Sequence, residues 1–281
     1  MSTARVTEFE LEGADGGPLR GEVFTAGDGS GRPAIVLCHG FRGSKDWGFF
    51  PMLSTRLARA GMTAICFNFS GSGFGATGEG FVDTERFSNS TFSNDVTDLA
   101  TVCESLVAGR LVEGLVRSEG YGLFGYSRGG AAAILHAAAN PRVRCLVTWA
   151  AISHTDRWSE SEIEDWRASG RRYVPGSDNE LYYNTNMLDD IEKNARELDL
   201  RRASTQLDAP WLIVHGEADG FVPAEEAHEL HEASEGKARI EVLPGGVHTF
   251  GLSETVTGSE TALRSAIGST MDWFATHLFL V

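Results

Sequence analysis

Short runs of apolar residues alternate with segments of helical periodicity over most of this 281-residue chain, and this alternation restricts its fold more than any other feature. A short run that is apolar at every position is typical of a strand buried on both faces of a parallel sheet. We interpret six such runs as strands, at residues 34–38, 63–69, 121–126, 143–149, 211–215 and 239–243. Strands separated by helices predict an α/β fold, in which helices cover both faces of a mostly parallel central sheet.

The segments between these runs carry the spacings and end signals of helices, such as apolar residues three and four apart and a terminal Gly or Asn-Pro. We expect helices at residues 50–60, from about 93, at 128–139, from about 223, and at 260–278. Two half-alternating segments at the beginning, 5–11 and 19–25, flank a turn-rich stretch. This pattern predicts an antiparallel hairpin at one edge of the sheet.

One connection is far longer than a crossover needs, because more than 50 residues separate the strands that end at 149 and begin at 211. In residues 156–208, 21 of 53 side chains are charged, with 8 basic against 13 acidic. Long connections are usually functional, and we predict a helical cap at residues 152–208 on a core formed by residues 1–151 and 209–281. The alternative is an extension that packs only on its own aromatic side chains, which are Trp158, Trp166, Tyr173, Tyr182 and Tyr183.

The strongest chemical signal is Gly-Tyr-Ser-Arg-Gly at residues 125–129, which fits the pattern G-x-S-x-G. It lies between a predicted strand and a predicted helix, where two glycines permit a strained turn that exposes the hydroxyl of Ser127. The alternative is an ordinary glycine turn. The flanking elements favour a catalytic nucleophile at Ser127.

A serine hydroxyl needs a base that is held by a carboxylate, and in such a fold the chain order is serine, acid, histidine. Asp219 and His248 each follow the end of a predicted strand in that order. Both therefore fall at the carboxyl edge of the sheet with Ser127, where sites of open α/β sheets form. Asp156, which follows an earlier strand, is the alternative acid.

The remaining histidines have simpler interpretations. His39 follows a strand in a His-Gly turn, and we expect it to support the backbone of this turn rather than to act as a catalytic base. His136 lies within a predicted helix, and His215 at the end of a strand, so both are expected to be core residues. No zinc-protease motif or other ligand cluster is present, and we expect neither a metal nor another cofactor.

Further residues are candidates for contact with a substrate. The backbone N–H groups of Phe41 and Arg128 are expected to form an oxyanion hole. Arg42 and Lys45 lie in the same loop as Phe41 and are candidates for contact with an anionic group, although solvated loop charges are common. In the predicted cap, we expect substrate contacts from His154, Trp158, Trp166, Tyr182 and Tyr183.

Four stretches together resemble the α/β-hydrolase superfamily: His-Gly-Phe at 39–41, the motif at 125–129, residues 216–223 and residues 245–250. The resemblance extends over nearly all of residues 20–281, and it is greatest to bacterial serine esterases of the dienelactone-hydrolase and feruloyl-esterase-like branch. Dienelactone hydrolases carry a cysteine nucleophile, and haloalkane dehalogenases and epoxide hydrolases an aspartate, where this chain has Ser127. The resemblance implies hydrolysis of carboxylic esters.

The composition of the chain argues against some classes of binding partner and indicates a location in the cell. The chain has 24 Lys and Arg against 39 Asp and Glu, a net charge of −15 that disfavours nucleic acid and anionic membrane surfaces. No stretch approaches the roughly 20 apolar residues of a membrane span. The first twenty residues are polar and acidic, and the four cysteines lie in apolar surroundings as free thiols, so we expect a cytoplasmic protein.

The sequence thus predicts a serine hydrolase that cleaves small carboxylic esters, with short acyl or aryl groups, through an acyl-enzyme on Ser127. An acyltransferase, a thioesterase or a peptidase would use the same three residues. An alternative of another class is a non-catalytic binding protein on a hydrolase scaffold. The sequence leaves the oligomeric state open.

Overall fold

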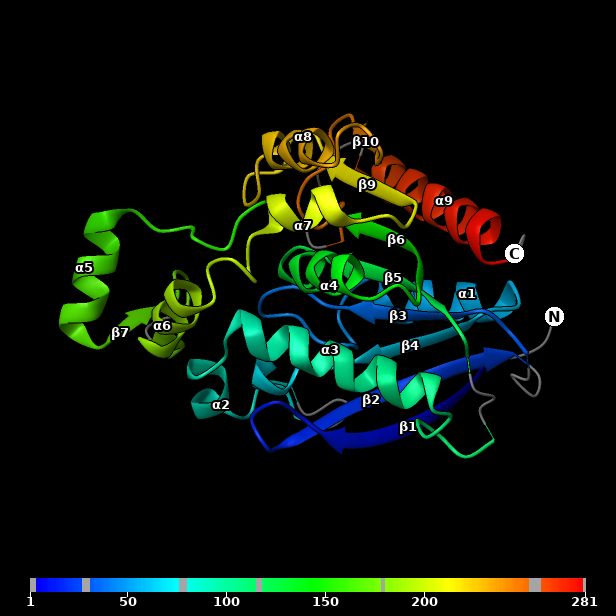
Figure 1. The fold of residues 1–281 in the computed structure, drawn as a ribbon, viewed down its shortest axis with the longest axis horizontal. Coiled ribbons are helices and arrows are strands. Elements are labelled where there is room, and N and C mark those ends of the chain that lie inside the picture. Colours follow the sequence, from blue (N-terminus) through cyan, green and yellow to red (C-terminus); the bar gives the residue numbers. More distant parts are fainter. Residues whose placement is uncertain are drawn as a thin grey trace.

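The fold is seen in a computed structural model, which describes residues 4–26, 31–75, 80–114, 118–177, 180–252 and 259–279. Within these residues the chain forms an eight-stranded sheet with the order β1-β2-β4-β3-β5-β6-β9-β10 (Figure 1). The strands are β1 (Ala4–Glu12), β2 (Pro18–Ala26), β3 (Ala34–Cys38), β4 (Thr63–Phe67), β5 (Tyr121–Tyr126), β6 (Val143–Trp149), β9 (Trp211–Gly216) and β10 (Arg239–Leu243).

Strand pairing agrees with the sequence prediction. The strands from β4 to β10 in this order pair in parallel, whereas β1 pairs with β2, and β2 with β4, in antiparallel fashion. The predicted hairpin is therefore correct, and it extends the parallel sheet at one edge. The strand predicted at 63–69 ends earlier, at Phe67, because the N–H of Phe69 donates to the ring of His39 instead of a neighbouring strand.

Helices cover both faces of this sheet (Figure 1). The helices of one face are α3 (Phe92–Val107), α4 (Arg128–Ala139), α7 (Leu200–Gln206) and α8 (Ala224–Ala233), and those of the other are α1 (Phe50–Arg59) and α9 (Ser259–Leu278). Shorter elements, η1 (Ser70–Ser72) and α2 (Thr84–Ser88), follow β4. None of the helices in the described part of the chain has the length and apolar character of a membrane span.

Side chains that alternate along each strand build the two halves of the core. Along β3, for example, Val36 packs on the side of α3 and α4, whereas Ile35 and Leu37 pack on the side of α1 and α9. All of β3, β4 and β5 is buried, as expected for parallel strands covered on both faces. The four cysteines are free and buried, which confirms their predicted role as apolar core residues.

The long connection between β6 and β9 holds α5 (Glu160–Ser169), β7 (Arg171–Tyr173), β8 (Tyr182–Asn184), α6 (Asn186–Lys193) and α7. The strands β7 and β8 form a separate antiparallel pair. In Figure 1, α5, β7 and α6 stand out beyond the end of the sheet, on the side of α2 and α3. In contrast, α7 packs against α4 and α8 in the helical layer, although it belongs to the same connection.

Candidate active site

Ser127 occupies a strained turn between β5 and α4. Its backbone angles, φ 54° and ψ −121°, are unusual for a residue with a side chain, and its N–H donates to the carbonyl of Trp149 at 2.9 Å. The glycines on either side are required sterically. A Cβ atom at Gly129 would lie 2.2 Å from the carbonyl oxygen of His39, and one at Gly125 would lie 2.6 Å from the Cα of Gly130. The turn therefore forms only with glycine at both positions.

His248 and Asp219 contact each other directly, as the sequence predicts. Nδ1 of His248 lies 2.7 Å from Oδ2 of Asp219, in the loops that follow β10 and β9. The other carboxylate oxygen of Asp219 accepts hydrogen bonds from the N–H groups of Phe221 and Val222, both at 2.9 Å. The Asp219 side chain has no exposed surface. The carboxylate is thus fixed by its own loop in a position that orients the imidazole.

His215 is a second histidine at this carboxylate. From the sequence, only a role in the core was expected for it. Its ring is fully buried, and its Nε2–H donates to the carbonyl of Val222 at 2.9 Å and lies 3.4 Å from Oδ2 of Asp219. Burial on its own would raise the pKa of Asp219, but the contacts with His215 and His248 outweigh it and hold this pKa far below its usual value. The carboxylate is therefore ionised throughout the neutral range.

The imidazole of His248 lies between two aromatic rings. The ring centroid of Tyr126 is 5.2 Å away and that of Phe221 is 5.6 Å away, and the Tyr126 hydroxyl donates to the backbone carbonyl of His248 at 3.2 Å. Ser127 and His248 line the same cavity. The structure thus brings all three predicted residues to the carboxyl edge of the sheet. Asp156, the alternative acid, is exposed and does not line this cavity.

The loop after β3 packs against Ser127, where an oxyanion hole was predicted. A Cβ atom at Gly40 would lie 3.0 Å from the Cβ of Ser127, so the loop approaches the serine closely. Within the described residues, neither the N–H of Phe41 nor that of Arg128 donates a hydrogen bond. Unpaired backbone donors next to a nucleophilic serine are the kind of group that stabilises a developing oxyanion in acyl transfer.

His39 holds this loop in place, which agrees with its predicted backbone role. Its Nδ1–H donates to the carbonyl of Gly40 at 2.9 Å, and its Nε2 accepts from the N–H of Phe69 at 3.1 Å. Burial lowers the pKa of His39 to about 4, so the ring is neutral and both of its nitrogens are committed. His136 is likewise a packing residue, since it is buried with its Nε2 2.7 Å from the hydroxyl of Tyr121.

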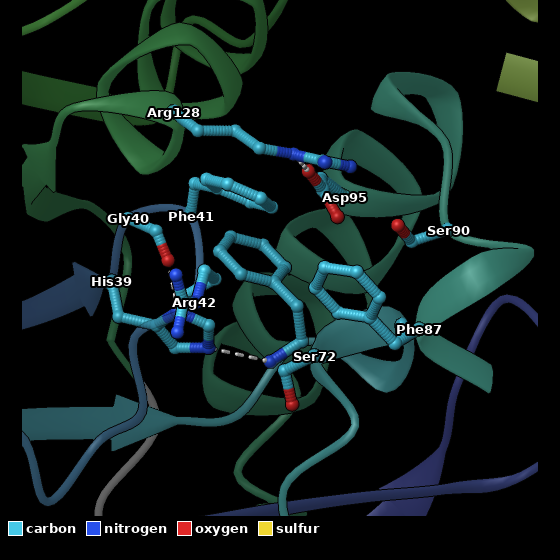
Figure 2. Close-up of a pocket in the computed structure, with 11 residues that line it drawn as sticks. His39, Gly40, Phe41, Arg42, Ser72, Phe87, Ser90, Asp95 and Arg128 are labelled. Carbon is cyan, nitrogen blue, oxygen red and sulfur yellow. Dashed lines mark hydrogen bonds and ion pairs between the residues drawn. The ribbon is translucent and has the colours of Figure 1, made fainter. Parts of the chain in front are cut away.

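Behind the loop lies a small hollow of about 20 Å³, lined by both aromatic and polar side chains, which is space for about one water molecule (Figure 2). Figure 2 shows Arg128 extended past Phe41 toward Asp95. Its Nε lies 2.6 Å from the Asp95 carboxylate, and its Nη1 donates to the hydroxyl of Tyr183 at 2.8 Å. The Arg128 side chain therefore connects α4, α3 and β8, beside the candidate nucleophile.

The surroundings of Arg128 keep its guanidinium group charged. Burial by itself would lower the pKa of Arg128, but Asp95 and Tyr183 outweigh it and raise this pKa, so the guanidinium stays protonated. Burial raises the pKa of Asp95, and the neighbouring guanidinium opposes that rise. Nη2 of Arg128 is buried and has no hydrogen-bond partner in the part of the chain that the structure describes.

A much larger cavity of about 670 Å³ opens over Ser127 and His248, within the range of small-molecule sites. Of the side chains predicted to contact a substrate, Trp158 and Tyr183 line it, and so does Tyr173. Three others do not line it. Trp166 is buried and packs on Trp158 at a centroid distance of 5.0 Å, and Tyr182 packs against Tyr173 and Arg171. His154 contacts Ser153 and approaches Glu226. A contact of these three with a substrate stays a prediction.

Several lining residues were not predicted from the sequence, because aromatic contacts to a substrate were expected only from the cap. They include the side chains of Phe41, Trp47, Phe92, Met187 and Phe221. Phe221, which is 75% exposed, follows Asp219 closely in the sequence, and Trp47 stacks on Tyr126 at 5.5 Å. An aromatic residue two positions after a predicted catalytic acid is a sequence signal that could have identified Phe221.

The two cationic candidates of the loop after β3 have different surroundings. Lys45 is buried, with its Nζ 2.8 Å from both Glu22 and Asp46, and it is therefore a structural ion pair rather than a substrate contact. Arg42 lines both the large cavity and the small hollow. Among the described residues, no cluster of three or more His, Cys, Asp or Glu side chains is arranged to hold a metal ion.

Comparisons with known proteins show the family and the fold of the chain. A family model described as "Alpha/beta hydrolase family" matches residues 35–254, which is most of the chain. The curated protein "Serine hydrolase BPHL" of Mus musculus is 24% identical over 237 residues, which cover 80% of this chain and 76% of the mouse protein.

Solved structures share the fold. The esterase domain of a Rhodothermus marinus protein has a TM-score of 0.65 at 18% identity and covers 98% of this chain and 99% of its own. The acylaminoacyl peptidase of Pyrococcus horikoshii has a TM-score of 0.72 at 17% identity, and the match covers 100% of this chain but only 43% of the peptidase. At these identities, the likeness concerns architecture alone.

Proposed function

The chain belongs to the alpha/beta hydrolase family, and from this premise we propose that it is a serine esterase whose catalytic residues are Ser127, His248 and Asp219. The observation that carries the proposal is the contact of 2.7 Å between His248 and Asp219 in a cavity that Ser127 also lines. On its motifs, we assign the chain to the dienelactone-hydrolase and feruloyl-esterase-like branch of the family.

The proposed reaction proceeds in two steps. Nε2 of His248 takes the proton of the Ser127 hydroxyl as Oγ attacks the ester carbonyl, and the imidazolium then protonates the departing alcohol. The acyl-enzyme that remains is hydrolysed by water, which His248 activates in the same way. Asp219 holds the proton on Nδ1, and the buried, ionised carboxylate stabilises the imidazolium in both steps.

The oxyanion formed in each step is stabilised by two backbone donors. One is the N–H of Phe41, in the loop after β3, and the other is the N–H of Arg128, the residue after Ser127. Both are free of other hydrogen bonds within the described residues. Loss of one such donor typically costs a factor of about 10² to 10³ in turnover. His39 supports this arrangement because it fixes the carbonyl of Gly40, the residue before Phe41.

We propose that the substrates are esters with short acyl or aryl groups. The cavity is lined mainly by aromatic and aliphatic side chains, and Trp158, Tyr173 and Tyr183 supply its walls from the predicted cap. Stacked and edge-on aromatic walls suit planar groups of moderate size. A panel of esters of rising chain length together with aryl esters tests this claim, and a preference for acyl chains of about twelve or more carbons would contradict it.

The cap's part in selectivity has a matched control. Trp158→Ala removes an aromatic wall of the cavity, whereas Tyr182→Ala removes a ring of the same segment that does not line it. We expect the first substitution to change the ranking of the ester panel and the second to leave it as in the wild type. Equal effects would remove the cap from substrate recognition.

An acyltransferase, a thioesterase or a peptidase would use the same proposed acyl-enzyme. These activities can be distinguished from esterase activity by the substrates that the protein turns over. The acylaminoacyl peptidase of Pyrococcus horikoshii shares this fold, so matched ester, thioester and anilide substrates of one acyl group should be compared. Esterase activity predicts kcat/KM values that are highest for the oxygen ester, with hydrolysis rather than transfer to added alcohols. A non-catalytic binding protein would turn over none of them.

We further propose that the protein acts in the cytoplasm. Four buried free cysteines are compatible with a reducing compartment, in which disulfides are rare. Fractionation of cells that express the full-length gene product, followed by detection with an antibody, tests this location.

A further inference from the structure

The charged side chains of the large cavity are mostly positive, although the whole chain has a net charge of −15. Four arginines and one glutamate line the cavity: Arg42, Arg128, Arg157, Arg172 and Glu162. The excess is unexpected in a protein with 39 acidic and 24 basic residues. A cavity with walls of low polarity strengthens the field of such charges.

Two of these arginines have carboxylate partners that do not line the cavity. Arg157 binds Glu226 through both terminal nitrogens, at 2.7 and 2.8 Å, and the Glu226 side chain is only 7% exposed. Arg128 binds Asp95, which borders the small hollow but not the large cavity. In both pairs the arginine is a lining residue of the large cavity and its carboxylate partner is not, so the positively charged residue of each pair is the nearer one.

Glu162, the carboxylate among the described lining residues, already has hydrogen-bond donors. Glu162 accepts a hydrogen bond from Arg172 at 2.7 Å and another from the N–H of Ser159 at 2.8 Å. Its pKa is lowered, mainly by the hydrogen bonds from Ser159 and Arg172, so it is a carboxylate that already has donors. Glu162 therefore does little to repel an anionic ligand.

Arg42 differs from the other three arginines of the cavity. Among the described residues, its guanidinium forms no hydrogen bond or ion pair, and its side chain is exposed. It follows Phe41, whose N–H is proposed for the oxyanion hole, and therefore lies in the loop that packs on Ser127. A planar guanidinium offers two parallel N–H donors, which match the two oxygens of a carboxylate.

We propose that the cavity binds esters that carry a carboxylate, and that Arg42 is its principal contact. The proposal rests on the esterase function proposed above and specifies its substrate class. It also differs from what the net charge of the long connection by itself would suggest, which is that the cap disfavours polyanionic acyl groups. Residues 156–208 have a net charge of −5 by count, 8 basic less 13 acidic. Among the described residues of that segment, the charged ones that line the cavity are Arg157, Arg172 and Glu162.

The test compares two aryl esters that differ in one charge. The 4-nitrophenyl half-ester of adipic acid carries a carboxylate at the end of its acyl chain, and its methyl ester is the neutral match. We expect the kcat/KM ratio of the anionic to the neutral substrate to exceed one at low ionic strength and to fall as salt is added. A ratio at or below one in the wild-type protein would overturn the proposal.

Variants identify the contact. Arg42→Gln should lower this ratio about tenfold, the effect of a lost charge-assisted contact, and Arg42→Lys should restore part of it. Arg167→Gln removes the same charge from a surface arginine that pairs with Asp189 and Glu192 and does not line the cavity, and it should leave the ratio unchanged. Equal ratios in the wild type and in Arg42→Gln would contradict the role of Arg42.

The neutral ester distinguishes failure of the proposed carboxylate subsite from failure of the proposed esterase function. Ser127-dependent hydrolysis of the neutral ester without preference for the anionic one would refute the carboxylate subsite and leave the esterase function intact. Failure of the folded protein to hydrolyse either ester, with no reaction of Ser127 toward an active-site probe, would refute the esterase function itself.

Discussion

Nδ1 of His248 lies 2.7 Å from Oδ2 of Asp219, although 29 positions separate the two residues in the chain. The contact depends on the parallel pairing of β9 and β10, which places the loop after each strand at the same edge of the sheet. Asp219 receives further hydrogen bonds from two backbone N–H groups and lies beside the buried ring of His215. The carboxylate is consequently held in its ionised form before any substrate binds.

Asp219→Asn should reduce turnover on the order of a thousandfold or more, because an amide no longer fixes the imidazole in the tautomer that accepts the serine proton. The fold should persist, since the amide oxygen of asparagine can still accept the hydrogen bonds from Phe221 and Val222. Steady-state kinetics with an aryl ester measure the loss, and circular dichroism checks the fold.

Asp156→Asn is the matched control for this change. Asp156 is the alternative acid of the sequence analysis, but its side chain is exposed and lies outside the large cavity. Its substitution should change kcat by less than about twofold, as is usual for surface positions. A large loss at Asp156 with a small loss at Asp219 would show that the acid had been assigned wrongly.

Tyr183→Phe should lower the free energy of unfolding by about 1–3 kcal/mol, because it leaves the buried Nη1 of Arg128 without its acceptor. The ring remains, and with it the stacking of Tyr183 on Phe41 at 5.8 Å and on Phe87 at 5.3 Å. Equilibrium unfolding in urea measures the difference.

Tyr182→Phe is the control, since no hydrogen bond of the Tyr182 hydroxyl is present within the described residues. We expect its effect to stay within about 0.5 kcal/mol. If Tyr183→Phe proved no more destabilising than Tyr182→Phe, the link from Arg128 to β8 would not contribute to stability.

Much of the architecture and of the site was predictable from the sequence, for reasons that particular residues make clear. The runs at β3 and β5 are apolar throughout because both faces are buried, and Ser127 must have glycine on each side because its turn packs against backbone. Such constraints are local to a few residues and can be recognised from residue type alone.

The direction of side chains in the long connection was not predictable. Trp158 and Trp166 are the same residue type in the same charged segment, yet Trp158 lines the cavity and Trp166 is buried against it. Tertiary packing decides this difference. The buried position of Lys45 depends in the same way on Glu22, a residue of a distant strand. The charge of a segment likewise does not reveal which of its charges face a cavity.

Asp98 gives a prediction for pH. It is buried, and its carboxylate accepts hydrogen bonds at 2.7 Å from the N–H groups of Ala14 and Ser70. Burial raises its pKa to about 6, although these hydrogen bonds oppose the rise. Between pH 4 and 6 the folded protein therefore holds a proton that the unfolded chain, with an ordinary pKa near 4, has lost.

The free energy of unfolding of the wild type, relative to that of Asp98→Asn, should accordingly decrease as the pH rises from 4 to 7. The pKa difference corresponds to about 3 kcal/mol over this range. Urea unfolding of both proteins across the range measures the change. A relative stability that rises with pH would mean that the hydrogen bonds from Ala14 and Ser70 outweigh the cost of burial.

Covalent labelling by a fluorophosphonate probe tests the central claim most directly, because the probe reacts with serines that an adjacent base activates. Intact-mass and peptide analysis should find one probe per chain, attached to Ser127. Labelling should be absent in Ser127→Ala and at least a hundredfold slower in His248→Ala, on the order expected for loss of a general base. Absence of labelling in the folded wild-type protein, or labelling that persists in Ser127→Ala, would contradict the account of this protein as a serine hydrolase.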